Sequence, residues 1–143
     1  MDLRSIKEIE EEIITEFGYF EDWMDKYNYL IDMGKTIPLI DPNYKSESNL
    51  ISGCQSRVWL HAIYDNGRIS FTADSDAVIT KGIANLLIRV MNNQTVEEIM
   101  NAEFDFVEKI GLKEHLSPTR SNGLMSMIKQ MKLYALAYKA KNA

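Results

Sequence analysis

Apolar side chains recur at helical spacing in the first part of the chain. They predict an amphipathic helix over 5–17, which Ser5 and Glu8 open as a capping box. A second helix is predicted over 21–33, with Gly34 as its C-terminal stop. Because the connection between them is short, we expect the two helices to pack together as a helical hairpin.

The pattern changes from helical spacing to alternation in the middle of the chain. Residues 35–49 show no periodicity and are rich in Pro, Asn and Ser, which indicates a long loop. Strand-forming residues then alternate over 58–64 and 69–73, and the Asp-Asn-Gly sequence at 65–67 is a hairpin turn signal. Residues 50–51 are candidates for a short third strand.

The rest of the chain is again helical in pattern. The predicted helices cover 74–91, 95–101, 105–110 and 117–139. Asp74, Ser75 and Asp76 offer caps for the first of them. Ser117 followed by Pro118 is a start signal for the last. This order of elements predicts a single α+β domain over 1–143, in which a small antiparallel sheet of two or three strands packs with helices.

The composition is that of an ordinary globular protein with an acidic balance. Of the 143 residues 45% are hydrophobic, and the net charge of −5 argues against nucleic acid or an anionic membrane as the main partner. The most apolar run, 83–90, is too short to span a bilayer, and Met1 to Glu12 contain no apolar signal-peptide stretch. A single cysteine excludes an internal disulfide, so we expect the reducing cytoplasm as the compartment.

That cysteine, Cys54, is the candidate reactive residue. It lies between the long loop and the first strand, and Gly53 beside it permits a tight turn and close approach by another molecule. Only the thiolate is a good nucleophile, and Arg57 and Arg120 are the cations considered for stabilising it. Composition alone nevertheless favours a buried, inert thiol.

Four segments carry a more specific pattern. They are WMDKYNYLIDMG at 23–34, GCQSRVW at 53–59, ADSDAVITKG at 73–82 and LSPTRSNGL at 116–124. Together they resemble, in order, the motifs of SufE-type sulfur acceptors, which activate cysteine desulfurases in iron–sulfur cluster assembly. The resemblance implies a fold shared with IscU-type scaffolds and a sulfur-accepting role for Cys54.

The resemblance also implies which proteins are the partners and what each of them does. A SufS-type cysteine desulfurase would hold sulfur as a persulfide, Cys54 would accept it, and an iron–sulfur scaffold complex would receive it. The pyridoxal phosphate would belong to the desulfurase, so no cofactor or metal is expected on this chain, which would be an accessory protein and a monomer or weak homodimer. Ser52, Gly53 and Gln55 would form a loop that carries Cys54 outward on docking, and Arg120 either lies beside that loop or is a surface arginine.

The other interpretations have less support. A single-cysteine redox sensor would need a thiol from a partner, because the chain has no resolving cysteine. His61 and His115 lack the spacing of a zinc site, and we expect His61 to be a satisfied sheet histidine. Asp74 and Asp76 are interpreted as helix caps rather than as a metal or acid–base pair.

Overall fold

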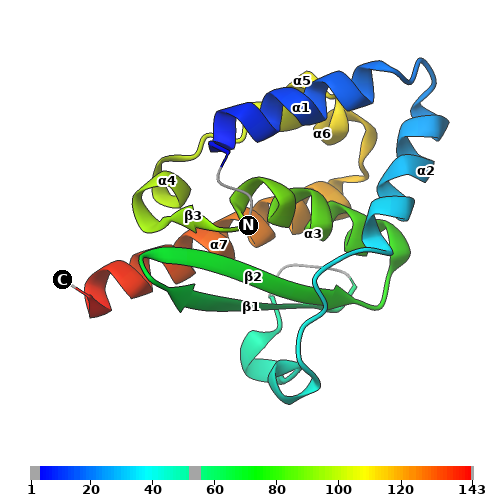
Figure 1. Ribbon diagram of the computed structural model, residues 1–143. Helices are drawn as coiled ribbons and strands as arrows, with labels where there is room; N and C mark the ends of the chain where they lie inside the picture. Colours follow the sequence, from blue (N-terminus) through cyan, green and yellow to red (C-terminus); the bar gives the residue numbers. More distant parts are fainter. Residues whose placement is uncertain (1–3, 52–55, 143) are drawn as a thin grey trace.

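The computed structural model of the protein describes residues 4–51 and 56–142 (Figure 1). In this part of the chain the helices are α1 (Ile6–Gly18), α2 (Trp23–Gly34), α3 (Val78–Met91), α4 (Val96–Asn101), α5 (Phe106–Lys109), α6 (Leu112–His115) and α7 (Pro118–Lys141). The strands are β1 (Val58–Asp65), β2 (Arg68–Ser75) and β3 (Gln94–Thr95). Two short 3₁₀ turns, η1 (Pro42–Tyr44) and η2 (Glu47–Asn49), lie in the loop before the sheet.

The sheet is antiparallel with the order β1-β2-β3. Asn66 and Gly67 form the two-residue turn between β1 and β2, and both have positive φ angles, 53° and 83°, as a type I′ turn requires. The predicted α+β fold and hairpin are therefore confirmed. The third strand differs from the expected one, because Gln94–Thr95 pairs with β2, whereas Leu50 makes only an isolated bridge with Trp59.

One face of the sheet is covered by α3 and α7, and α1, α5 and α6 form a further layer beyond α3 (Figure 1). Alternate residues of the two long strands point into this interior. The buried apolar residues of these strands are Val58, Leu60, Ala62, Ile69, Phe71 and Ala73, and they join the buried faces of the helices in one hydrophobic cluster. On the opposite face, Tyr44 of η1 stacks on His61 and Lys45 lies over the ring of Trp59.

The predicted helical hairpin is wrong: α2 turns away from α1 and packs against α3 (Figure 1). Two glycines explain this contact. A Cβ atom on Gly82 would lie 2.0 Å from the carbonyl oxygen of Leu30, and one on Gly34 would lie 2.9 Å from the Gly82 nitrogen. Gly34 is the last residue of α2, and Lys35 after it has a right-handed backbone conformation, so the helix does not end on a left-handed residue. The role of Gly34 is to permit close packing against Gly82.

The predicted caps have mixed outcomes. Ser5, Thr95 and Ser117 each accept a backbone N–H bond at the start of α1, α4 and α7, as expected. The caps predicted for α3 are wrong, because the helix begins at Val78 and its cap residue, Ala77, has no side-chain cap bond. The short helix α6 was not predicted; it follows directly after Gly111, whose φ of 75° ends α5 as expected. No helix among residues 4–51 and 56–142 is long and apolar enough to cross a membrane.

Candidate functional site

Most of the predicted site falls outside the residues that the structure describes. Cys54, Ser52, Gly53 and Gln55 all belong to the segment 52–55, for which no structural description is given. The segment's two neighbours and the residues around them are described, and they define the surroundings of the candidate thiol.

Both neighbours of the segment are anchored to regular structure. On one side, Ile51 is buried, and its N–H donates to the carbonyl oxygen of Val58 at 2.8 Å. On the other side, the hydroxyl groups of Ser56 and Thr80 lie 3.0 Å apart, which links the start of β1 to the first turn of α3. Ile51 and Ser56, the described residues on either side of 52–55, are therefore both held by hydrogen bonds to regular structure.

Asp76 adds a second tie between the same two elements. Its Oδ1 accepts the N–H of Arg57 at 3.0 Å, and its own N–H donates to the Arg57 carbonyl oxygen at 3.3 Å. The carboxylate predicted to cap α3 instead holds the backbone that follows the candidate thiol. The pairing extends the β1–β2 register by one residue beyond Val58 and Ser75, so the hairpin turn signal at 65–67 could have predicted it.

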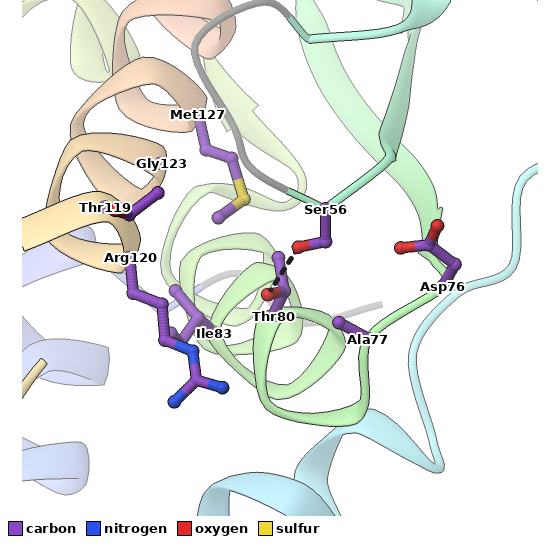
Figure 2. A pocket seen from close by; sticks show the side chains of 9 residues that line it. All are labelled: Ser56, Asp76, Ala77, Thr80, Ile83, Thr119, Arg120, Gly123 and Met127. Carbon is purple, nitrogen blue, oxygen red and sulfur yellow. Dashed lines mark hydrogen bonds between the residues drawn. The ribbon is translucent and has the colours of Figure 1, made fainter. Parts of the chain in front are cut away.

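A pocket of about 390 Å³ opens beside Ser56, between the start of α3 and the start of α7 (Figure 2). Its lining residues are Ser56, Asp76, Ala77, Thr80, Ile83, Thr119, Arg120, Gly123 and Met127. Figure 2 shows Ser56, Asp76 and Ala77 on one side and Thr119, Arg120 and Gly123 on the other. The pocket combines an apolar floor with hydroxyl groups, one carboxylate and one guanidinium.

Arg120 is the cation that the structure brings to this pocket. It lies in the first turn of α7, its guanidinium donates a hydrogen bond to the hydroxyl of Tyr27, and its Cζ atom is 5.9 Å from the Tyr27 ring centroid. The α2 helix thus holds an exposed arginine at the pocket edge. Arg57 is also exposed, but it does not line the pocket.

Asp74 belongs to a separate cluster at the end of β2. Its carboxylate accepts bonds from Lys45 at 2.9 Å and from the Ser75 N–H at 2.8 Å, and it pairs with Lys81 at 3.3 Å. Burial raises the pKa of the Asp74 carboxyl, but these hydrogen bonds outweigh it and leave the pKa below its ordinary value. Asp74 is therefore an ion-pair centre rather than a helix cap.

The two histidines lie in different aromatic contacts. His61 is half-buried on β1 and stacks on Tyr44 with 3.9 Å between ring centroids. His115 stacks on Trp23 at 4.1 Å, and its Nδ1 lies 2.8 Å from the Gly111 carbonyl oxygen. Within residues 4–51 and 56–142, no group of three or more His, Cys, Asp or Glu side chains is arranged to hold a metal ion.

Sequence reasoning missed several of the pocket residues. Thr80, Ile83, Gly123 and Met127 were assigned to helices without any functional role. Two signals were available. Thr80 and Gly123 lie in the segments 73–82 and 116–124 that resemble SufE motifs, and Thr80 is a polar residue on the apolar side of α3 that is only 7% exposed. A buried hydroxyl needs a hydrogen-bond partner, and Ser56 supplies it.

Comparisons with known proteins define the class and then the family. A solution structure of a hypothetical protein from Thermus thermophilus has the same fold, with a TM-score of 0.76 over 94% of this chain and 97% of that one; at 19% identity it shows the fold alone. The family model for SufE, described as an Fe-S metabolism associated domain, matches residues 11–135. The chain belongs to the SufE family.

Relatives with higher sequence identity agree with this assignment. The chain is 38% identical over 98% of its length to the SufE-like protein 1, chloroplastic/mitochondrial, of Arabidopsis thaliana, of which it spans 39%. It is 38% and 36% identical, over 85% of its length, to uncharacterized SufE-like proteins of Rhizobium etli and Rhizobium meliloti, of which it spans 86% and 91%. Family membership supports a role in sulfur transfer for iron–sulfur metabolism.

Proposed function

We propose that this protein accepts sulfur on Cys54 from the persulfide of a SufS-type cysteine desulfurase and passes it to an iron–sulfur scaffold complex. One observation carries the proposal: the SufE motif at 53–59 contains Ser56 and Arg57, which are bonded to Thr80 of α3 and to Asp76, beside a pocket that also holds Arg120. The segment that contains the only cysteine of the chain is thus attached to the rim of a polar pocket.

Covalent geometry limits the distance between Cys54 and Ser56, which lines this pocket. Cys54 is two residues before Ser56, so their Cα atoms are at most about 7 Å apart. A cation near a thiol favours the thiolate, which is the reactive form. Arg120, held by Tyr27, is the described cation that lines this pocket, and we propose that it favours the Cys54 thiolate.

The proposed reaction is a thiol exchange that needs no external oxidant. The Cys54 thiolate attacks the outer sulfur of the desulfurase persulfide, the sulfur–sulfur bond breaks, and the desulfurase cysteine leaves as a thiolate. Cys54 then carries the persulfide. Pyridoxal phosphate belongs, in this proposal, to the partner, where it releases sulfur from free cysteine.

Two further parts of the proposal concern delivery and compartment. We propose that Ser52, Gly53 and Gln55 allow Cys54 to reach the partner's active site, since glycine permits close approach of another backbone. The cytoplasm is the proposed compartment, because a lone thiol remains reduced there. The plant relative carries the description chloroplastic/mitochondrial, which is a statement about that protein.

The proposal is tested by desulfurase turnover. A SufS-type desulfurase is mixed with free cysteine, and the release of alanine is followed with and without this protein. The wild type should raise turnover severalfold, and Cys54→Ser should abolish the stimulation. Turnover that is the same with wild type, with Cys54→Ser and with no added protein would overturn the proposal.

The role of Arg120 is tested separately, by the reaction of Cys54 with iodoacetamide at neutral pH. Arg120→Ala should slow this alkylation, because less of the thiol is ionised, whereas Arg120→Lys should retain most of the rate. Arg57→Ala is the matched control, since Arg57 is exposed and does not line the pocket. Equal rates in all variants would remove Arg120 from the mechanism.

A further inference from the structure

The long helix α7 has a second apolar face in addition to the one it buries. Its core face consists of Leu124, Met127, Ile128, Met131 and Ala135. Three other large apolar residues of α7 remain open to solvent, with Met125 47%, Leu133 45% and Leu136 49% exposed. They recur at spacings of eight and three residues, so they lie along one side of the helix.

These residues line a groove that Met100 of α4 borders, and α4 packs beside α7 (Figure 1). The groove has a volume of about 390 Å³ and is lined by Met100, Met125, Ile128, Lys129, Lys132, Leu133 and Leu136. It continues into a hollow of about 530 Å³ that shares four of these residues and extends to Phe104 and Val107. We call the first of these two volumes, with the seven residues that line it, the α4–α7 groove.

The charge of the groove is positive, in contrast to that of the chain. All 21 Asp and Glu residues lie outside α7, whereas α7 carries Arg120, Lys129, Lys132, Lys139 and Lys141. Lys129 and Lys132 are the charged residues that line the groove, and Lys132 is fixed by a 2.6 Å bond from its Nζ to the Ala102 carbonyl oxygen. Glu103 and Glu108 appear only in the adjoining hollow.

We propose that the α4–α7 groove binds an amphipathic helix of a partner protein, with acidic residues beside its apolar stripe. A groove lined by Met and Leu fits the apolar face of a helix, and methionine adapts to the shape of what it contacts. The lysines at the groove then face the acidic flanks of the bound helix. This inference does not depend on the proposed sulfur transfer.

Two other occupants fit these observations less well. A second copy of the chain, with α7 packed on α7, would bring Lys129 and Lys132 toward the same lysines of the other copy, where like charges repel. A bilayer surface offers no ridge of side chains to fill a concave groove.

The position of the groove separates it from the pocket beside Ser56. Arg120 and Leu133 are 13 residues apart on α7, which corresponds to about 20 Å along the helix. The two sites also use opposite sides of α7, because Met125 and Lys129 of the groove lie about 200° around the helix from Gly123 and Met127 of the pocket. Two partners can therefore bind at the same time.

The test uses a labelled synthetic amphipathic peptide of about 18 residues with Leu on one face and Glu on its flanks. Fluorescence anisotropy measures its affinity for the wild-type protein, and NMR chemical shifts locate its site. We expect saturable binding, shifts at Met100, Met125, Leu133 and Leu136, and about tenfold weaker binding to the double variant Leu133→Ser/Leu136→Ser. The matched control Ile63→Ser removes another apolar side chain, 47% exposed on β1, and should bind as the wild type does.

The contribution of the lysines to peptide binding is tested with charge-reversal variants. Lys129→Glu should weaken binding of the acidic peptide and strengthen binding of a version with Lys in place of Glu, whereas Lys141→Glu, beyond the groove on the same helix, should change neither. Four outcomes would overturn the proposal. They are no saturable binding of the acidic peptide, shifts outside the groove, self-association that Leu133→Ser abolishes, and flotation with anionic vesicles that the same variant prevents.

Discussion

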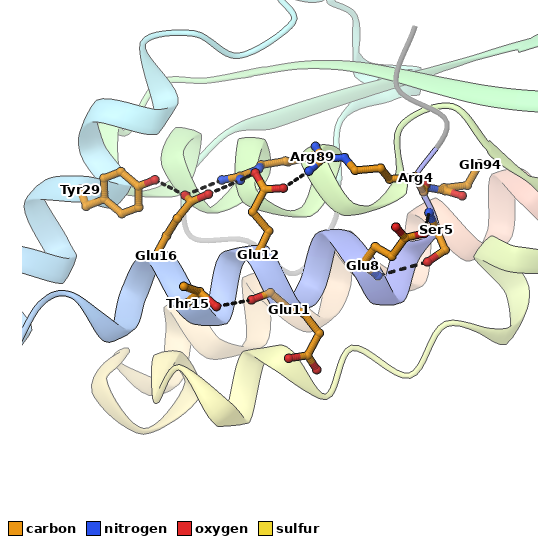
Figure 3. Close-up of polar contacts among 10 residues, drawn as sticks. All are labelled: Arg4, Ser5, Glu8, Glu11, Glu12, Thr15, Glu16, Tyr29, Arg89 and Gln94. Atoms are coloured by element: carbon orange, nitrogen blue, oxygen red, sulfur yellow. Dashed lines mark hydrogen bonds and ion pairs between the residues drawn. The ribbon is translucent and has the colours of Figure 1, made fainter.

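Among single residues, Arg89 connects α3 to α1 through two carboxylates, Glu12 and Glu16 (Figure 3). It lies on α3 and donates to Glu12 at 2.6 Å and to both carboxylate oxygens of Glu16, one of them at 2.8 Å. Tyr29 of α2 donates its hydroxyl to the same Glu16 carboxylate. One half-buried guanidinium therefore joins α1 to α3, and Glu16 joins both to α2.

This network makes a testable contribution to stability. The hydrogen bond from Arg89 lowers the pKa of Glu16 below its ordinary value of 4.5, against the raising effect of burial. A lowered pKa means that the stabilisation is complete above pH 4.5 and is lost as the pH falls through the folded-state pKa. Glu16→Gln should lower the free energy of unfolding by about 2 kcal/mol at neutral pH.

Urea denaturation across pH measures this effect. The difference between wild type and Glu16→Gln should shrink as the pH falls below 4.5, since protonation removes the same charge from the wild type. Glu11→Gln, on the same helix but outside the network, should match the wild type at every pH. A difference between wild type and Glu16→Gln that stays constant down to acid pH would contradict this interpretation.

At this scale, sequence predicts local contacts and misses distant ones. The caps at Ser5, Thr95 and Ser117 were predictable because donor and acceptor are three residues apart. Arg89 was visible only as a charge that interrupts an apolar run. Its partner Glu12 is 77 residues away, and no spacing rule connects the two.

At the scale of elements, the contact between α2 and α3 depends on backbone proximity. Gly82 lies against the Leu30 carbonyl, and a Cβ atom there would have no space. Gly82→Ala should therefore lower the free energy of unfolding by about 3 kcal/mol, although alanine is the better helix former. Urea denaturation checks this loss.

The matched control for that substitution is Gly18→Ala. A Cβ atom on Gly18 meets nothing within 4 Å, so the change should stay within about 0.5 kcal/mol. If Gly82→Ala proved as stable as Gly18→Ala, the close approach of α2 and α3 would be wrong.

The same contact shows why the helical hairpin was predicted incorrectly. A short connection between two amphipathic helices constrains where the second begins but not the direction it takes. The direction depends on complementary small residues, and Gly34 and Gly82 are 48 positions apart in the sequence. Gly34 at a helix end was also open to interpretation as an ordinary stop signal.

The tie between β1 and α3 yields a functional prediction. Asp76→Ala removes the acceptor for the Arg57 N–H, so the residues after Cys54 lose an anchor and persulfide acceptance should slow severalfold. Asp76→Asn keeps the Oδ1 acceptor and should retain most of the rate. Single-turnover transfer from a desulfurase persulfide, with circular dichroism to check folding, measures both variants.

Two results would count against the anchoring role of Asp76. If Asp76→Asn were as slow as Asp76→Ala, the carboxylate charge in the pocket would matter more than the backbone anchor. If both variants matched the wild type, Asp76 would have no part in presenting the thiol.

At the scale of the whole molecule, α7 contributes residues to two separate sites. The pocket beside Ser56 lies at the start of this helix, and the α4–α7 groove lies further along it. The types and approximate limits of most elements were predictable from periodicity, caps and turn residues. The pocket was not, because it forms where β1, α3 and α7 meet, and only tertiary packing brings them together.

The most direct test of the central claim is the intact mass of this protein after incubation with a SufS-type desulfurase, free cysteine and pyridoxal phosphate. The account predicts that the wild type gains sulfur, that reductant removes it, and that peptide mapping places it on Cys54. Cys54→Ser should gain none. A wild-type mass that stays unchanged, while the desulfurase is shown to carry its own persulfide, would contradict the assignment of Cys54 as the sulfur acceptor.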